Sequence, residues 1–160
     1  MPRVAVGGTF DPLHDGHKAL LKKAVELSRG GELIIGLTSD EMARNKIDPV
    51  YDFKSRHDEV MKFIRTQGVI ASIVKLDDPY GPTLIDDFDY LVVSPETHPV
   101  GLKINMIRKE KGLKLLKIVL VDYVLAQDGL PISGTRIRRG EIDEHGKVLK
   151  DIKRIIGNNN

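Results

Sequence analysis

The chain contains no cysteine and no tryptophan, and each absence excludes a class of functional site. Without cysteine there can be no disulfide, no thiolate nucleophile and no cysteine-ligated metal centre. This agrees with a cytoplasmic location, which we expect for the protein. Aromatic residues make up only 5% of the 160 residues, so stacking platforms for single-stranded nucleic acid are not expected either.

Long apolar runs are also missing, and the charges nearly balance. No run approaches the roughly 20 residues that a membrane-spanning helix needs, and the apolar part of the amino-terminal stretch is too short for a secretory leader. The formal net charge is only +2. We therefore expect no membrane partner and no nucleic-acid partner, and any anion site has to be local.

What the sequence does contain is a regular alternation of apolar runs and helical segments. This alternation, with strands that are almost wholly apolar, predicts one α/β domain over residues 1–160, built on an open parallel sheet with helices on both faces. A last amphipathic helix is expected from about residue 141. The five strands are expected at residues 3–7, 32–38, 69–76, 89–94 and within 114–124, and the helices between them at 16–29, 39–46, 51–68 and 99–112.

The stretch GGTFDPLHDGH, residues 7–17, connects the first expected strand to the first expected helix. In an open parallel sheet, ligands bind beyond the carboxyl ends of the strands. Glycines allow the backbone to come close to a ligand, and Thr9 offers a hydroxyl. His14 and His17 lie on one face of the starting helix, whose amino end attracts anions. The stretch therefore predicts a phosphate site with two imidazoles as hydrogen-bond donors.

Two other interpretations of this histidine pair stay open at this point. Histidines three residues apart could hold a metal ion, although no third ligand is obvious nearby in the sequence. They could also be structural residues of a tight turn. Neither a P-loop nor a dinucleotide-binding glycine fingerprint occurs after the first strand, so those two phosphate sites are excluded.

A second candidate phosphate site follows the last expected strand, in the stretch ISGTRIR at residues 132–138. Ser133 and Thr135 are good capping residues, and the hydroxyl and N–H groups of such a helix start form a cup for an anion. Arginine side chains can grip phosphate with two parallel hydrogen bonds. Positive charge is supplied by three arginines: Arg136, Arg138 and Arg139. The alternative is a solvated basic helix start.

The two stretches together resemble the two signatures of the nucleotidyltransferase superfamily, the relatives of class I aminoacyl-tRNA synthetases. Residues 7–17 are similar to G-x-F-x-P-x-H-x-G-H, and residues 132–138 to I-S-S-T-x-I-R, with Gly134 in place of the second serine. The resemblance implies a Rossmann-like, five-stranded fold of the HIGH type. Residues 3–156 resemble the archaeal type of the phosphopantetheine adenylyltransferase family. That implies transfer of the adenylyl group of ATP to 4′-phosphopantetheine, with Mg²⁺, to give 3′-dephospho-coenzyme A and pyrophosphate.

The resemblance also implies roles for individual residues. His17, Lys46 and Thr9 would be catalytic, and Thr9 and Lys46 would bind the acceptor substrate. No metal site on the protein is implied. For Lys46 an exposed helix-end lysine is the alternative, and Arg44 is the neighbour that might replace it. The residues implied for ATP binding are Gly8, Thr9, Phe10, His14, Gly16, His17, Ile132, Ser133, Gly134, Thr135 and Arg136.

Several points stay open from the sequence. Residues 94–101 lack the arginines of bacterial relatives, so Ser94, Glu96 and Thr97 are weaker candidates for ribose or adenine contacts. Residues 76–83 are a candidate rim for the pantetheine arm. The alternatives are another adenylyl- or cytidylyltransferase, acting on nicotinamide mononucleotide or an alcohol phosphate, and a nucleotide-binding module without turnover. A tRNA synthetase fragment is disfavoured because no KMSKS-like loop occurs. The oligomeric state is open.

Overall fold

A computed structural model describes residues 1–45 and 50–149 of the chain. Five parallel strands form one sheet in the order β3-β2-β1-β4-β5, so the predicted open parallel sheet is confirmed. The third strand begins two residues later than expected, the fourth lacks one polar residue at each expected end, and the fifth lies within its expected range. The strands are β1 (Arg3–Gly8), β2 (Glu32–Thr38), β3 (Ala71–Leu76), β4 (Tyr90–Val93) and β5 (Lys117–Leu120).

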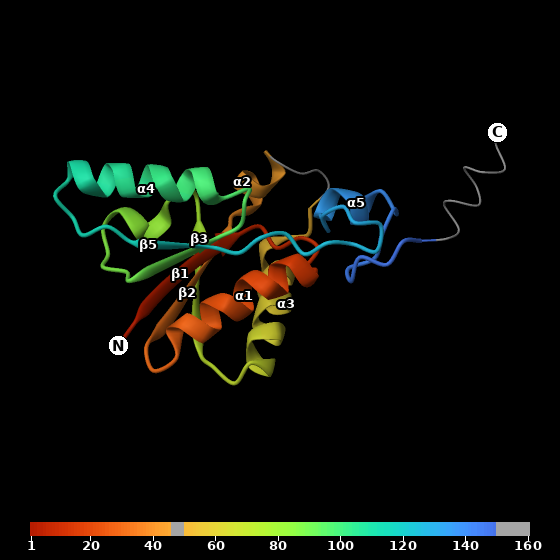
Figure 1. Ribbon diagram of the computed structural model, residues 1–160, viewed down its shortest axis with the longest axis horizontal. Coiled ribbons are helices and arrows are strands. Elements are labelled where there is room, and N and C mark those ends of the chain that lie inside the picture. The colour runs from red at the N-terminus through yellow and green to blue at the C-terminus, as the bar shows by residue number, and fades with distance from the viewer. Residues whose placement is uncertain (46–49, 150–160) are drawn as a thin grey trace.

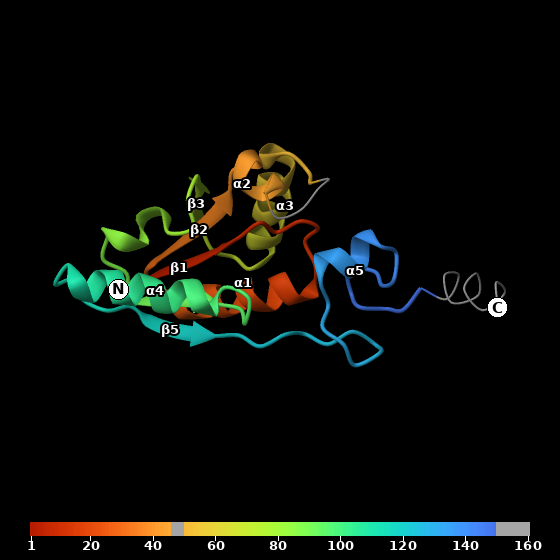
Figure 2. The ribbon, with the colours of Figure 1, turned by 90° about the horizontal axis from the view of Figure 1, so that it is seen from above.

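Helices cover both faces of the sheet, as Figure 1 shows. One face carries α1 (Asp15–Ser28) and α3 (Phe53–Thr66), and the other carries α4 (His98–Glu110). The short helices α2 (Asp40–Arg44) and α5 (Gly134–Arg138) and the 3₁₀ turn η1 (Gly81–Leu84) lie in the connections. Seen from above in Figure 2, α5 lies at the end of the molecule opposite the amino terminus, beyond the end of β1. No helix of the described ranges is long and apolar enough to cross a membrane.

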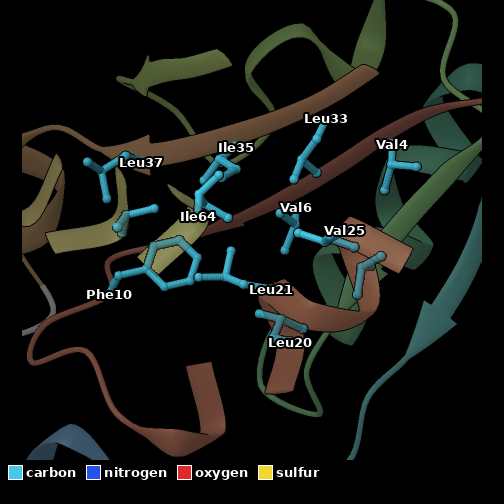
Figure 3. Close-up of a cluster of buried hydrophobic side chains, with 13 residues drawn as sticks. Val4, Val6, Phe10, Leu20, Leu21, Val25, Leu33, Ile35, Leu37 and Ile64 are labelled. Atoms are coloured by element: carbon cyan, nitrogen blue, oxygen red, sulfur yellow. The ribbon is translucent and has the colours of Figure 1, made fainter. Parts of the chain in front are cut away.

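Side chains of successive strand residues alternate between two cores. Val4 and Val6 of β1 are buried with Leu21 of α1 and Ile64 of α3, in the cluster drawn in Figure 3. Ala5, between them in sequence, belongs to the second cluster, under α4. This period of two is what a strand with both faces covered requires. The central strand β1 is therefore fixed from both sides, and its carboxyl end offers a rigid base for the connection that follows.

Helix starts follow the expected capping chemistry. Ser39 caps α2, its hydroxyl accepting from the N–H of Met42 at 3.2 Å, and Asp52 caps α3, its carboxylate accepting from the N–H of Ser55 at 2.8 Å. Such caps satisfy an N–H group that has no partner inside the helix. The starts of both helices are thus set by local side-chain chemistry.

The helix expected from about residue 141 is wrong for residues 141–149. Ile142 instead pairs with Val148 in an isolated antiparallel bridge. The carboxylate of Asp143 accepts from the N–H groups of His145 and Lys147, at 2.9 and 2.8 Å, and closes the turn between them. Aspartate turn chemistry therefore overrides the apolar periodicity. The remaining positions of that prediction, Ile152, Ile155 and Ile156, lie outside the described residues.

Candidate functional site

The two predicted phosphate-binding stretches lie beside each other at the carboxyl ends of the strands (Figure 2). Residues of the β1–α1 connection and of the stretch before α5 line one cavity of about 290 Å³. The two stretches also contact each other, because Arg138 Nη1 donates to the backbone oxygen of Asp11 at 2.9 Å. Gly8, Thr9, Phe10, His14, Gly16 and His17 line the cavity from one side, and Ile132, Ser133, Gly134 and Thr135 from the other.

His14 caps α1 with its own ring. Its Nδ1 accepts hydrogen bonds from the N–H groups of Gly16, at 3.0 Å, and His17, at 3.3 Å. The Nδ1 of His17 accepts in return from the N–H of His14 at 3.3 Å, which completes a reciprocal capping box. A Cβ atom at Gly16 would lie 2.8 Å from the His14 ring. The glycine of this motif therefore makes room for the imidazole cap.

Both imidazoles are neutral, and their protons are placed by these hydrogen bonds. Burial lowers the pKa of His14 to about 4, and it lowers the pKa of His17 to about 3, with a smaller contribution from the neighbouring His14. A neutral imidazole whose Nδ1 accepts has its proton on Nε2. The rings stack with centroids 3.7 Å apart. Both residues line the polar cavity, so its wall contains two neutral imidazoles that can each donate one hydrogen bond.

One element of the prediction for this stretch is wrong: the first N–H groups of α1 are not free for phosphate. The N–H groups of Gly16 and His17 bond to the His14 ring, and the N–H of Asp15 donates to the backbone oxygen of Glu144 at 3.0 Å. The histidine cap and the carboxyl-terminal turn take up the donors that an anion would have used. Anion contacts at this helix start therefore fall to side chains.

The start of α5 differs in this respect. Ser133 caps it, with Oγ accepting from the N–H of Arg136 at 3.2 Å. Among the described residues, the N–H groups of Gly134 and Thr135 meet no acceptor, so they remain available to a ligand in the cavity. A Cβ atom at Gly134 would lie 2.8 Å from the backbone oxygen of Asp11. The departure from the family's serine thus permits the close approach of the two stretches.

The structure brings a different arginine to the cavity from the one expected. The guanidinium of Arg136 is held by the carboxylates of Asp128 and Glu141, and Arg136 does not line the cavity. Arg138 does line it. The reason is helical geometry, because residues 135 and 138 share one face of a helix, whereas residue 136 is turned about 100° away.

The remaining predicted residues divide into three groups. Thr9 lines the cavity, and its hydroxyl accepts from Thr38 Oγ1 at 3.0 Å. Phe10 is 2% exposed, has a left-handed backbone with φ of 53°, and packs its ring edge-on against His17. Phe10 therefore supports the His17 ring from the core side. Lys46 lies outside the described residues, and its neighbour Arg44 is exposed and lines neither cavity.

Other lining residues come from connections that follow β4 and β5. Ser94, Glu96 and Thr97, the candidates for ribose or adenine contacts, line the cavity. Residues 121–124 also line it and were not predicted. The signal that could have found them is their place directly after a strand, because the carboxyl ends of all strands in a parallel sheet lie at the same edge, where ligands bind.

A smaller apolar cavity of about 100 Å³ adjoins the first. Gly7, Gly8, Thr38 and Thr97 line both cavities, so the two share part of their wall. Its walls are formed by α4, including Val100, and by the predicted rim at residues 76–83, which contributes Leu76, Pro79, Tyr80, Pro82 and Thr83. The site therefore combines a polar chamber with an apolar one.

A metal-binding role for the histidine pair gains no support from this geometry. Within residues 1–45 and 50–149, no group of three or more histidine, aspartate or glutamate side chains is placed to hold an ion. The Nδ1 atoms of His14 and His17 are both occupied by backbone N–H groups. The interpretation as phosphate donors is the one that the hydrogen bonds favour.

Comparison with known proteins agrees with this site. The chain matches the cytidylyltransferase-like family over residues 5–140. It is 54% identical to the phosphopantetheine adenylyltransferase of Methanosarcina barkeri over 96% of each chain. It is 51% identical to that of Archaeoglobus fulgidus, over 92% of this chain and 99% of the other. A crystal structure from Archaeoglobus fulgidus, described as a protein with unknown function, has a TM-score of 0.72 and 48% identity, covering 75% of this chain and 89% of that one. The chain therefore belongs to the archaeal phosphopantetheine adenylyltransferases, within the cytidylyltransferase-like family.

Proposed function

We propose that the chain transfers the adenylyl group of ATP to 4′-phosphopantetheine, forming 3′-dephospho-coenzyme A and pyrophosphate. The observation that carries the proposal is the single cavity lined both by the histidine pair and by the start of α5, with an apolar chamber adjoining it. By the character of their linings, the polar chamber suits a triphosphate, and the apolar one suits part of an extended, largely uncharged arm. The close relatives bear the name of the same activity.

The chemistry needs positioned donors more than it needs a base. An oxygen of the acceptor phosphate attacks the α-phosphorus of ATP, the new P–O bond forms, and the bond to the bridging oxygen breaks to release pyrophosphate. A phosphate is already a nucleophile near neutral pH, so no residue has to remove a proton from it. Neutral imidazoles with Nε2–H directed to phosphate oxygens suit this task, which rests on alignment and charge stabilisation.

Each group of the site has a part in this scheme. His17 Nε2–H would donate to the α-phosphate oxygens in the transition state, and His14 would bind the nucleotide phosphates. The free N–H groups of Gly134 and Thr135 would hold the outgoing phosphates. Thr9 would orient the acceptor phosphate. By family resemblance, Lys46 would bridge the donor and acceptor phosphates.

Magnesium fits this scheme as a partner of the nucleotide. The described residues hold no cluster of ligands for an ion, whereas Mg²⁺ readily binds through substrate phosphates and water. We therefore expect the ion to enter with ATP and to lower the repulsion between the triphosphate and the acceptor phosphate. The polar chamber supplies the residues that hold the complex.

A pyrophosphate-release assay tests the proposed reaction and its alternatives together. The chain is incubated with Mg²⁺ and either ATP or CTP, against 4′-phosphopantetheine, nicotinamide mononucleotide and glycerol 3-phosphate. We expect release with ATP and 4′-phosphopantetheine and at most traces elsewhere. Preference for another pair would reassign the acceptor, and nucleotide binding without release from any pair would favour a binding module.

The apolar chamber can be tested separately as the site of the pantetheine arm. Val100 lines the chamber from α4, so Val100→Phe fills it and should raise the KM for 4′-phosphopantetheine about tenfold or more, with the KM for ATP little changed. Leu102→Phe, on the exposed face of the same helix, is the matched control. Equal kinetics for the two variants would place the arm elsewhere.

A further inference from the structure

Arg56 of α3 is a buried cation beneath the candidate site. It is 1% exposed, and burying a charge is costly unless it is paired and hydrogen-bonded. Its Nε donates to the backbone oxygen of Tyr51 at 2.9 Å, and Nη2 pairs with Asp40 at 3.0 Å. Nη1 donates to the backbone oxygen of Thr9 at 3.3 Å and to Thr38 Oγ1 at 3.2 Å. The side chain therefore joins α3 to the ends of β1 and β2.

These contacts fix the direction of a hydrogen-bond chain. A guanidinium can only donate, so Thr38 Oγ1 is the acceptor of the bond from Arg56. The Thr38 hydroxyl then donates its own hydrogen to Thr9 Oγ1, at 3.0 Å. Thr9 is thereby an acceptor from the protein, and its hydroxyl hydrogen has no acceptor among the described residues. The chain ends in one hydrogen that is free to be donated to a ligand.

The hydrogen-bond chain passes the shared wall of the two cavities at Thr38 and ends at Thr9, beside that wall, in the polar chamber. Thr38 lines both the polar and the apolar chamber, and Thr9 lines the polar one. An acceptor whose arm lies in the apolar chamber would present its phosphate near this shared wall. Phosphate oxygens need donors, and a hydroxyl whose lone pair is already occupied is oriented as a donor.

We infer that Arg56 is a positioning residue for adenylyl transfer, acting through Thr38 to hold the Thr9 hydroxyl as a donor to the acceptor phosphate. The inference rests on the proposed function. Arg56 itself does not line either cavity, so its effect on the reaction passes through the two threonines. This chain of Arg56, Thr38 and Thr9 is called the relay below. It predicts that replacing Arg56 or Thr38 changes the kinetics for the phosphate acceptor and leaves the KM for ATP unchanged.

The test is a set of variants assayed by pyrophosphate release. Thr38→Val keeps the shape and removes the hydroxyl, and it should lower kcat/KM for 4′-phosphopantetheine about tenfold, with the KM for ATP unchanged. Thr38→Ser should restore most of the loss. Ser28→Ala removes a buried hydroxyl at the far end of α1 and serves as the control for stability alone. A Thr38→Val enzyme with the kinetics of the wild type would overturn the relay.

A double-mutant comparison separates positioning from a structural role. Because the relay acts only through Thr9, Arg56→Lys and Thr38→Val should each lower activity in the wild type but add little in a Thr9→Val background. Losses of the same size in both backgrounds would show that Arg56 only stabilises the fold. Melting temperatures of all variants are measured alongside.

The wild type distinguishes failure of the relay from failure of the proposed function. Turnover of 4′-phosphopantetheine by the wild type together with unaffected variants overturns the relay alone. If the wild type prefers another phosphate acceptor, the variants are measured with that one, because the relay concerns the acceptor phosphate itself. A wild type that neither turns over nor, by calorimetry, binds any phosphate acceptor overturns both.

Discussion

The two helix starts that face the polar chamber satisfy their backbone donors in opposite ways. At α1, the His14 ring occupies the N–H groups of Gly16 and His17, so the backbone has little left to offer a ligand. At α5, Ser133 occupies one N–H, and those of Gly134 and Thr135 stay free. A similar position at the sheet edge therefore yields two kinds of phosphate site, one made of side chains and one made of backbone.

This difference matches what each position would do in the transfer. The hydrogen-bond donor at the reacting phosphorus has to stabilise a charge and a geometry that change during the reaction. A histidine side chain with a fixed tautomer can do so. The outgoing phosphates keep their charge throughout and need only a steady set of donors. Catalysis depends on contacts that strengthen in the transition state, so the largest kinetic effects are expected at α1.

The largest expected effect comes from the α1 donor. His17→Ala should lower kcat about 100-fold or more in the pyrophosphate-release assay, the usual cost of one preorganised donor to a developing charge. His17→Asn is the sharper variant, because its side-chain oxygen can still accept from the His14 N–H while the Nε2–H donor is lost. Turnover of a folded His17→Asn enzyme within a few-fold of the wild type would remove His17 from the transition state.

The acid dependence of stability should come from the same helix start. In the folded chain, burial lowers the pKa values of His14 and His17 to about 4 and about 3, whereas in the unfolded chain both are near 6.5. Well above pH 6.5 both histidines are neutral in both states and add no pH dependence to stability. Between pH 6.5 and 4 the unfolded chain binds more protons, so the free energy of unfolding falls as pH falls. The slope is up to about 1.4 kcal/mol per pH unit for each histidine.

Urea unfolding at several pH values between 5 and 7 measures this slope. His14→Asn keeps an acceptor at the N-cap and removes one titrating group, so it should flatten the curve without a large loss at pH 7. An unchanged slope in that variant would show that His14 is accessible to protons in the folded chain.

Close packing between the two stretches gives the next effect. In Gly134→Ser the new Cβ would lie 2.8 Å from the Asp11 backbone oxygen and 2.9 Å from Arg138 Nη1, so the two stretches must move apart. Overpacking of this kind costs about 1 to 3 kcal/mol. We expect a lower melting temperature and about a tenfold lower kcat/KM for ATP, and Gly134→Ala should behave alike. Wild-type kinetics in the serine variant would show that the family's serine fits here without cost.

The parts of the fold that could be predicted from the sequence are those in which no other local interaction opposes the structure that the sequence pattern favours. The alternation of apolar runs gave the parallel sheet, and Asp52 gave the start of α3, because burial and capping act in the same direction there. At residues 141–149 the apolar spacing indicated a helix, but the Asp143 turn prevailed. The pattern was correct about burial, since Ile142 is 1% exposed, and wrong about the period.

In the site, too, local sequence patterns predicted some residues and missed others. The two motifs identified the phosphate-binding stretches, because their glycines, hydroxyls and histidines are close in sequence. Arg56 and Thr38 were missed because they come together only through the packing of α3 against the sheet. The sequence indicated three arginines as sources of positive charge and assigned Arg136 to ATP from the motif, whereas helical spacing from Thr135 favours Arg138.

The smallest effect is expected at these two arginines, and it tests whether geometry or resemblance identifies the ligand. Arg138 lines the cavity, so Arg138→Gln should raise the KM for ATP about fivefold, while loss of its bond to the Asp11 backbone oxygen should lower the melting temperature only modestly. Arg136→Gln leaves Asp128 and Glu141 without their shared cation, so it should mainly lower the free energy of unfolding. A higher KM for ATP in Arg136→Gln but not in Arg138→Gln would mean that Arg136 leaves its two carboxylates when ATP binds. The arginine that contacts ATP would then differ from the one that lines the cavity of the free protein. Measuring the KM for ATP and the unfolding free energy of both variants separates these outcomes, because each arginine is predicted to affect mainly one of the two quantities.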